Sequence, residues 1–261
     1  MARGFGATLG AGTTDVVRTG LLSSGSDRRS YSVWFNRNGL GGGNFGNIFF
    51  KAPFSETFYF NNTGSFWHYD RCNAAGTQTA RHNLGAVGTS GALTGVWNHC
   101  LLTHDQSAGL VSPIAYWNGI IQSSQATTSA SVTTATNVDP YYIGNDSVAS
   151  RVFDGQLAHF AVWDGVILGR AEALALFCGA HPATIAPGNL VCYLPLDGMH
   201  SPELDYVLAD GPGLVTGTRA GTTQPFSAPV HIPLSDAPLY PGAFVDPATI
   251  AAARQYAVTV T

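Results

Sequence analysis

The sequence predicts an all-β protein, an antiparallel jelly-roll β-sandwich with one short helix and a C-terminal arm. Two observations lead to this fold class. Short apolar and aromatic segments, several of them alternating with a period of two, recur between clusters of Gly, Asn and Pro. The 261 residues include 31 Gly and 14 Pro and only 11% charged residues, so turns should be plentiful and helices few. A β-sandwich of this length commonly forms one domain.

The first predicted strand covers residues 31–37, YSVWFNR, and we expect it to be central in its sheet. A glycine cluster follows, and then come short aromatic segments bounded by turn residues, which predict a meander of strands. These segments are residues 47–51, 56–62 and 65–70. Residues 72–95 are rich in Gly, Ala, Thr and Asn, so we expect them to be mostly loop.

The strand pattern resumes at residues 97–104, and residues 114–122 then place Asn118 and Gly119 between two apolar arms. Because Asn-Gly tolerates the positive φ angles of a type I′ turn, this segment predicts a hairpin. The Ser, Thr and Ala residues of 123–136 predict a long exposed connection.

Two more strands are predicted at residues 141–144 and 155–163, and the second is apolar on both faces, as in the middle of a sandwich. A helix follows, with Gly169 as its N-cap and Glu172 three residues further on. Its buried face is predicted to contain Ala173, Leu174, Phe177 and Cys178, and Gly179 is expected to end it. Residues 190–194, LVCYL, predict the next strand.

The domain boundaries predicted from these patterns are 1–223 for the sandwich and 224–261 for a proline-rich C-terminal arm. A proline recurs every three to five residues from 225 to 241, which favours an extended conformation. Asp246 and Pro247 then provide a helix start signal for residues 248–256. This arm could dock on a neighbouring subunit or fold back on its own domain, and the sequence leaves both open.

Charge, hydropathy and cysteine spacing narrow the classes of function that the chain can have. The net charge of −4 provides no cationic surface for phosphates, so we expect no nucleic-acid binding. No stretch of eighteen apolar residues occurs, and the first residues lack an apolar core, so we expect neither membrane insertion nor a signal peptide. The near absence of Glu and Lys indicates either a surface covered by neighbouring copies or a neutral polar surface. The four cysteines lack CxxC spacing, and we interpret them as free thiols, three of them buried.

The order of these segments resembles the concanavalin A-like lectin/glucanase superfamily in its laminin G-like branch. The resemblance covers roughly residues 10 to 220 and depends on an ordered series of weak motifs. The series is DVV at 15–17, YSVWFNR at 31–37, WNHCLLTHD at 97–105, YWNG at 116–119, YYIGN at 141–145, FDGQLAHFAVWD at 153–164 and LVCYLPLDG at 190–198. The fold implied by this resemblance agrees with the pattern of strands.

Proteins with a similar start, a GGGNFG turn and a PYYIGN strand are often virion proteins of bacteriophages. The resemblance therefore implies a virion structural protein, such as a capsid decoration, head-fibre or tail component, located in the particle and assembled in the host cytoplasm. Its expected partners are its own copies, in a homo-oligomer such as a trimer, other virion proteins and a host-surface glycan. The alternative is a carbohydrate-binding adhesion module, and a glycoside hydrolase is the third hypothesis.

Hydrolases of this superfamily carry an ExDxxE strand motif, in which two carboxylates share one face. The chain has three glutamates, Glu56, Glu172 and Glu203, and no such motif can be written with them. We therefore expect no enzymatic activity and assign no catalytic residue. His99 lies in an apolar strand and is interpreted as a core histidine.

Two kinds of binding residue follow from the resemblance and from side-chain chemistry. Laminin G-like domains often bind calcium through Asp and Asn oxygens, and the candidates are Asn145, Asp146 and Asp154, whose alternative role is turn formation. We expect no cofactor, with calcium as the one alternative. Sugar binding uses exposed aromatic rings. The candidate residues are Trp67, Tyr69, Trp117 and Tyr141, whose alternative role is core packing.

Overall fold

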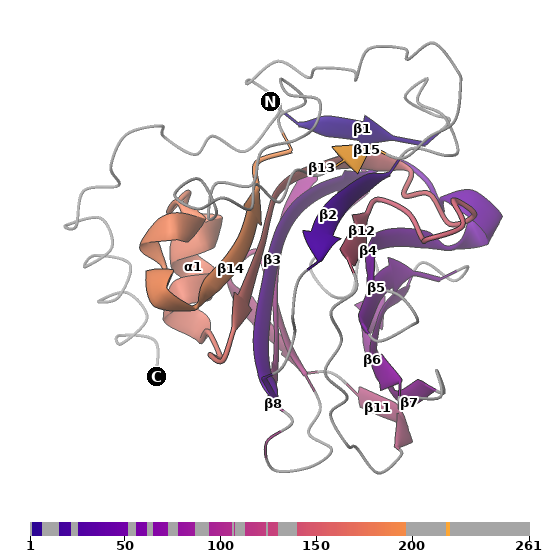
Figure 1. Ribbon diagram of the computed structural model, residues 1–261. Helices are drawn as coiled ribbons and strands as arrows, with labels where there is room; N and C mark the ends of the chain where they lie inside the picture. Colours follow the sequence, from indigo (N-terminus) through magenta and orange to yellow (C-terminus); the bar gives the residue numbers. More distant parts are fainter. Residues whose placement is uncertain are drawn as a thin grey trace.

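The computed structural model confirms the predicted antiparallel β-sandwich with one α-helix (Figure 1). It describes residues 2–6, 16–21, 26–51, 56–61, 65–72, 78–86, 94–105, 107, 113–123, 125–129, 140–196 and 218–219. Among them are the strands β1 (Arg3–Phe5), β2 (Val17–Leu21), β3 (Arg28–Arg37), β4 (Gly46–Lys51), β5 (Glu56–Phe60), β6 (Ser65–Cys72), β7 (Gln78–Ala86), β8 (Trp97–Asp105), β9 (Ile114–Trp117), β10 (Ile120–Ser123), β11 (Gln125–Ser129), β12 (Pro140–Ile143), β13 (Gly155–Asp164), β14 (Leu190–Leu194) and β15 (Thr218–Arg219). The helix α1 is Arg170–Phe177, and the 3-10 turns η2, η3 and η4 are Gly42–Asn44, Pro182–Thr184 and Pro187–Asn189.

The strands form two sheets. Sheet A has seven strands in the order β1-β13-β3-β8-β9-β10, with β14 also paired to β13. Sheet B has eight strands in the order β11-β7-β6-β5-β4-β12-β2-β15. The chain passes from sheet A to sheet B between β10 and β11, which follow one another closely in the sequence.

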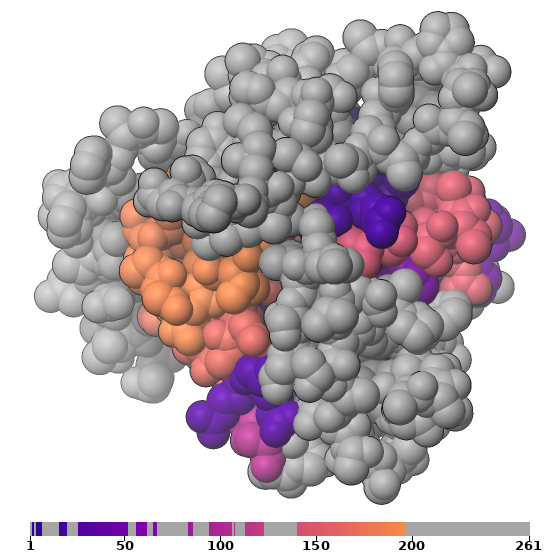
Figure 2. All heavy atoms as spheres, viewed as in Figure 1, coloured from indigo at the N-terminus to yellow at the C-terminus, as the bar shows by residue number. Residues whose placement is uncertain are grey.

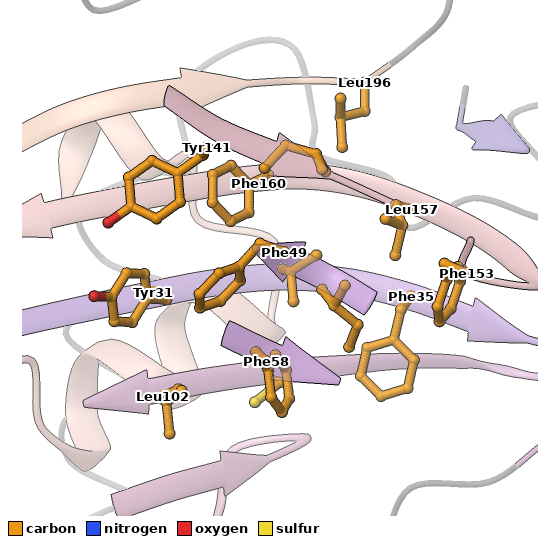
Figure 3. Close-up of a cluster of buried hydrophobic side chains, with 14 of the residues drawn as sticks. Tyr31, Phe35, Phe49, Phe58, Leu102, Tyr141, Phe153, Leu157, Phe160 and Leu196 are labelled. Carbon is orange, nitrogen blue, oxygen red and sulfur yellow. The ribbon is translucent and has the colours of Figure 1, made fainter. Parts of the chain in front are cut away.

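The main core lies between the two sheets and is rich in aromatic side chains. Phe35 of sheet A contacts Phe60 and Phe66 of sheet B, with ring centres 5.9 and 5.6 Å apart. Figure 3 shows rings from both sheets turned toward one another, and the hydroxyl oxygens of Tyr31 and Tyr141 at the same end of the cluster. Burial of such rings provides the largest favourable contribution to folding.

Sheet A is buried on both sides because α1 covers the face that points away from sheet B (Figure 1). The Trp34 ring of β3 stacks on Phe177 of the helix, with centres 5.8 Å apart. Glu172 accepts a hydrogen bond from the Gly169 amide at 2.9 Å, and Gly179 follows with a φ of 96°, so both predicted ends of the helix are confirmed.

The glycine cluster after β3 packs against the chain just before β13. A Cβ atom on Gly41 would lie 2.4 Å from the Val152 carbonyl oxygen, and one on Gly42 would lie 2.8 Å from that of Ser150. The amide of Gly42 also donates to the Val152 carbonyl at 2.8 Å. These glycines are required because two backbones meet without room for side chains.

Several sequence predictions are confirmed, among them the hairpin at Asn118 and Gly119, whose φ angles are 51° and 78°. Others are wrong. Residues 72–95 contain β7, and the connection 123–136 contains β11. The buried face of the helix is predicted in part: Ala173 is buried and Phe177 packs on Trp34, but Ala175 and Leu176 are buried in place of Leu174, and Cys178 is exposed.

The proline-rich segment 225–241, the terminal helix 248–256 and therefore the arm 224–261 lie outside the described residues. Among the described cysteines, Cys100 and Cys192 are buried free thiols. His99 is fully buried, as predicted, and burial lowers its pKa to about 3. No helix in the part of the chain that the structure describes is long and apolar enough to span a membrane.

Candidate functional site

Two of the four predicted sugar-binding residues lie in the core, which corrects their assignment. The side chains of Trp117 and Tyr141 are each 1% exposed. Trp117 packs on Phe66 with ring centres 4.2 Å apart, and the Tyr141 ring lies edge-on to Phe49. A ring enclosed in this way cannot present its face to a sugar, so core packing, the alternative role, applies to both residues.

The other two predicted residues, Trp67 and Tyr69, are positions of β6 on the opposite face of sheet B. Register pairs Trp67 with Tyr59 and Tyr69 with Thr57. The core side of β5 carries Phe58 and Phe60 in alternation with these two partners. Trp67 and Tyr69 therefore occupy the face that points away from the core, which we call the outer face of sheet B.

The outer face carries a row of residues that crosses five strands. Cross-strand pairing runs from Tyr69 to Thr57, then to Phe50, Tyr142 and Arg18. The Phe50 and Tyr142 rings are 6.1 Å apart. Neighbouring strands lie about 4.8 Å apart, so such a row has the dimensions of an extended ligand of several units.

A second row lies beside the first. Register pairs Trp67 with Asn83 and with Tyr59, and Tyr59 with Asn47. Phe45 borders this row, with its ring centre 5.9 Å from that of Tyr59. Aromatic and amide side chains therefore share the outer face.

Two arginines stack on rings at the borders of the outer face. The Arg18 guanidinium lies 5.6 Å from the centre of the Tyr142 ring, and the Arg151 guanidinium lies 5.1 Å from that of Phe45. Arg18 is exposed, and the other three residues are half-buried. Figure 2 shows indigo atoms of the N-terminal strands at the surface beside pink atoms of the segment that begins at residue 140.

The interior of the outer face is buried and contains unpaired polar groups. Phe50, Thr57, Tyr59 and Asn47 are at most 3% exposed. Among the described residues, neither the Asn47 amide nor the Thr57 hydroxyl has a hydrogen-bond partner. An unpaired buried polar group costs about 1–3 kcal/mol, so these two positions would be stabilised by a polar partner.

The core side of sheet B holds a charged cluster that sequence reasoning missed. Glu56 pairs with Arg29 and accepts hydrogen bonds from the hydroxyls of Tyr31, at 2.5 Å, and Tyr141. The Lys51 ammonium lies 4.5 Å from the centre of the Tyr141 ring. Burial alone would raise the pKa of Glu56, but Arg29, Lys51 and the two hydroxyls outweigh it and lower the pKa to about 2.

The cluster is a structural ion-pair network. Glu56 is 1% exposed, and all of its partners are charged or hydroxyl groups of the core. The other described glutamate, Glu172, caps α1. A signal for the cluster was present in the sequence, because Lys51 and Glu56 occur at the ends of two strands that are otherwise largely aromatic.

The predicted calcium ligands lie in and beside the loop between β12 and β13. Asn145 accepts hydrogen bonds from the amides of Asp146 and Arg151, at 2.9 and 3.0 Å. Asp146 accepts bonds from the amides of Val148 and Ser150, at 3.2 and 2.8 Å. These side chains therefore serve as turn formers, the alternative role.

Asp154 lies apart from these bonds, against the glycine cluster. A Cβ atom on Gly39 would be 2.2 Å from its Oδ2, and its charge acts on Arg37. Within the described residues, no group of three or more His, Cys, Asp or Glu side chains is placed to hold a metal ion. Asn145 and Asp146 thus have the turn-forming role in this structure, and calcium binding by the three residues stays a prediction.

Comparison with solved structures identifies similar folds. A candidate carbohydrate-binding protein from Bacteroides ovatus superposes with a TM-score of 0.56 at 19% identity, over 87% of this chain and 60% of that one. The CBM40 domain of a Ruminococcus gnavus IT-sialidase gives a TM-score of 0.43 at 13% identity, over 58% of this chain and 83% of that one. Only the first TM-score exceeds 0.5, and at 19% identity it establishes the shared fold alone.

The present chain thus spans 60% of the length of the Bacteroides protein. No curated protein sequence matches the chain. A family model of laminin G type, described as the concanavalin A-like lectin/glucanases superfamily, matches residues 11–170, which is more than half of the chain. Together with the two antiparallel sheets, this match shows that the chain belongs to the concanavalin A-like lectin/glucanase superfamily.

Proposed function

We propose that the protein is a carbohydrate-binding module that holds a glycan on the outer face of sheet B. The observation that carries this proposal is the row from Tyr69 to Arg18, which combines aromatic, hydroxyl and cationic residues in register across five strands. A ring face matches the apolar face of a pyranose, and polar groups nearby bind its hydroxyls.

Access to this face begins at β2 and β12. Arg18 is exposed and Tyr142 is half-buried, so a ligand first meets these two side chains. Asn47 and Thr57 lie deeper, and their unpaired polar atoms are suited to sugar hydroxyls once a ligand reaches them. In this arrangement the half-buried Tyr142 ring, with Arg18 beside it, is the stacking platform that we propose.

We propose further that the module binds without cleaving its ligand. Retaining hydrolysis needs two carboxyl groups about 5 Å apart on the substrate side. In the strands of sheet B the acidic residues are Glu56 and Asp70, and register pairs them with each other on the core face. Incubation of the purified protein with laminarin tests this point, because release of reducing sugar would contradict it.

A glycan array followed by titration calorimetry tests the binding proposal on the full chain. The wild-type protein should show saturable binding, and Tyr142→Ala should weaken it about ten-fold, which corresponds to about 1.4 kcal/mol of stacking. Ile121→Ala is the matched control, because Ile121 is exposed on sheet A. Equal melting temperatures would show that both variants are folded.

Two outcomes would overturn the binding proposal. One is the absence of saturable binding to every glycan, and the other is binding that Tyr142→Ala leaves unchanged. The second outcome would place the ligand elsewhere on the molecule.

A virion structural role, implied by the sequence resemblance, is the second candidate. It is favoured by the hairpin β9–β10, which exposes Ile114, Ile120 and Ile121 to 38%, 65% and 52% at the edge of sheet A. An exposed apolar edge strand is suited to pairing with another chain. In this proposal the protein assembles with its own copies and with other proteins of a bacteriophage particle.

Light scattering after size-exclusion chromatography tests the self-association that this second role requires. The wild-type protein should form an oligomer that Ile121→Lys dissociates, whereas Val148→Lys, a change at a loop residue that is 76% exposed, should leave it intact. A wild-type protein that is monomeric at high concentration would contradict the assembly proposal.

A further inference from the structure

The charges of sheet B are divided between its two faces. Its strands contain two acidic residues, Glu56 and Asp70, and both are on the core face by register. Arg18 is on the outer face, because register pairs it with Tyr142. The outer face therefore carries the exposed guanidinium of Arg18, whereas the Glu56 carboxylate lies on the core side, in a chain whose net charge is −4.

The three arginines of β3, in sheet A, have partners within the protein. Arg28 pairs with Asp105 at 3.1 Å, and Arg29 pairs with Glu56. Arg37 donates a hydrogen bond to the Gly39 carbonyl at 2.6 Å and lies in the field of Asp154. Protein groups thus already satisfy these three guanidinium groups.

Arg18 and Arg151 differ from them. Within the described ranges, no carboxylate forms an ion pair with either side chain, and each guanidinium lies over an aromatic ring. Asp146, in the same loop as Arg151, has oxygens that accept bonds from Val148 and Ser150. Ring stacking orients a guanidinium and leaves its N–H groups available to an anion.

We infer that the ligand of the outer face is an acidic glycan, whose anionic group binds Arg18 while its sugar ring stacks on Tyr142. This inference rests on the proposed function and adds the chemical class of the ligand. A planar guanidinium binds a carboxylate or a sulfate through paired N–H bonds, so both kinds of acidic sugar share the required chemistry.

A polyanion other than a glycan would fit this face less well. An oligonucleotide also offers anions and flat rings, but the net negative charge of the chain opposes a long polyanion. The outer face combines few cations with several hydroxyl-binding groups, which favours a glycan with isolated charges. The experiment must therefore distinguish nucleic-acid binding from glycan binding.

The test is an array of acidic oligosaccharides, bearing uronate, sialic acid or sulfate, each printed beside its neutral counterpart made by esterification, desialylation or desulfation. The full-length wild-type protein should bind the acidic member of at least one pair ten-fold or more tightly than the neutral member. The Arg18→Gln variant should bind that acidic glycan no more tightly than it binds the neutral counterpart. It should bind the neutral counterpart as tightly as the wild-type protein does. The identity of the preferred pair distinguishes carboxylate from sulfate.

Arg28→Gln is the matched control, because Arg28 is an exposed arginine at the end of a strand in sheet A. It should retain the preference for the acidic glycan, and raised salt should weaken that preference in the wild-type protein.

Three results separate this inference from the proposed function. Equal binding of acidic and neutral sugars that still depends on Tyr142 would overturn the acidic preference and leave the glycan-binding function standing. The absence of binding to any sugar would overturn both. Equal binding of a single-stranded oligonucleotide, reduced to the same extent by Arg18→Gln and Arg28→Gln, would show unspecific attraction of polyanions and would also overturn the acidic preference.

Discussion

The Arg29 guanidinium on β3 pairs with the Glu56 carboxylate on β5, so an ion pair joins sheet A to sheet B through the core. The hydroxyls of Tyr31 and Tyr141 bind the second oxygen of the same carboxylate. The carboxylate is therefore enclosed by donors from both sheets, and both parts of the pair are at least 95% buried.

Replacing Glu56 by Gln should destabilise the protein strongly. The change keeps the shape of the side chain but removes the buried negative charge that faces Arg29 and Lys51, and breaking a buried pair in this way costs about 3–5 kcal/mol. Chemical denaturation measures the loss. The control is Arg28→Gln, which breaks an exposed pair with Asp105 and should cost less than about 1 kcal/mol. Similar small losses in both variants would contradict the role of the cluster.

Acid should remove the advantage of Glu56. Its pKa is lowered from 4.5 to about 2 in the folded protein, so the stability it provides is complete above pH 4.5 and is lost as the pH falls toward 2. The difference in unfolding free energy between wild type and Glu56→Gln should therefore be constant from pH 7 to 5 and shrink below 4.5. His99 contributes equally to the pH dependence of both proteins, so its contribution cancels in this difference and the contribution of Glu56 remains. A difference that stays constant down to pH 2.5 would refute the assignment.

Substitution of Gly41 by Ala should cost about 2 kcal/mol or more. Its φ of 83° is unfavourable for a residue with a Cβ atom, and that atom would lie 2.4 Å from the Val152 carbonyl oxygen. Gly188→Ala is the control, because a Cβ atom there meets nothing within 4 Å. Thermal denaturation of the two variants should separate them, and equal melting temperatures would mean that the two backbones do not pack as described.

Thiol reactivity should follow burial. In a Cys72→Ser background, Ellman's reagent should modify Cys178 quickly in the native protein, since it is exposed. Cys100 and Cys192 should react only after denaturation, because both are buried and burial raises the pKa of the Cys100 thiol. Fast modification of two or more thiols without denaturant would disagree with this packing.

The strands that alternation predicted are those whose signal is local. The segment YSVWFNR sends Tyr31, Val33 and Phe35 to the core, as its period of two indicates. The strand β7 escaped prediction because its sequence, QTARHNLGA, is polar and contains a glycine. It forms because β6 and β11 pair with it on either side, and such long-range pairing leaves no periodic signal in the strand itself.

The candidate site was predicted in part for a related reason. Tyr141 and Tyr142 are adjacent, and alternation sends them to opposite faces without saying which face is the core. Tyr141 was chosen and is buried, whereas Tyr142 lies on the outer face. Register places the strand positions of Trp67 and Tyr69 in line with Tyr59 and Thr57, and their role in sugar binding stays a prediction. Only the pairing of β12 with its neighbouring strands decides which of the two tyrosines, Tyr141 or Tyr142, faces the core.

The placement of α1 gives the sandwich two unlike sides. The helix covers sheet A, where it lies against β8 and β10 and stacks on Trp34 of β3, while the aromatic rows belong to sheet B. A tether or carrier attached at the exposed Cys178, beside the helix, would hold the molecule by its helical side. Immobilised in this way, every copy would turn sheet B toward the solution, and the protein molecules of the coating would share one orientation.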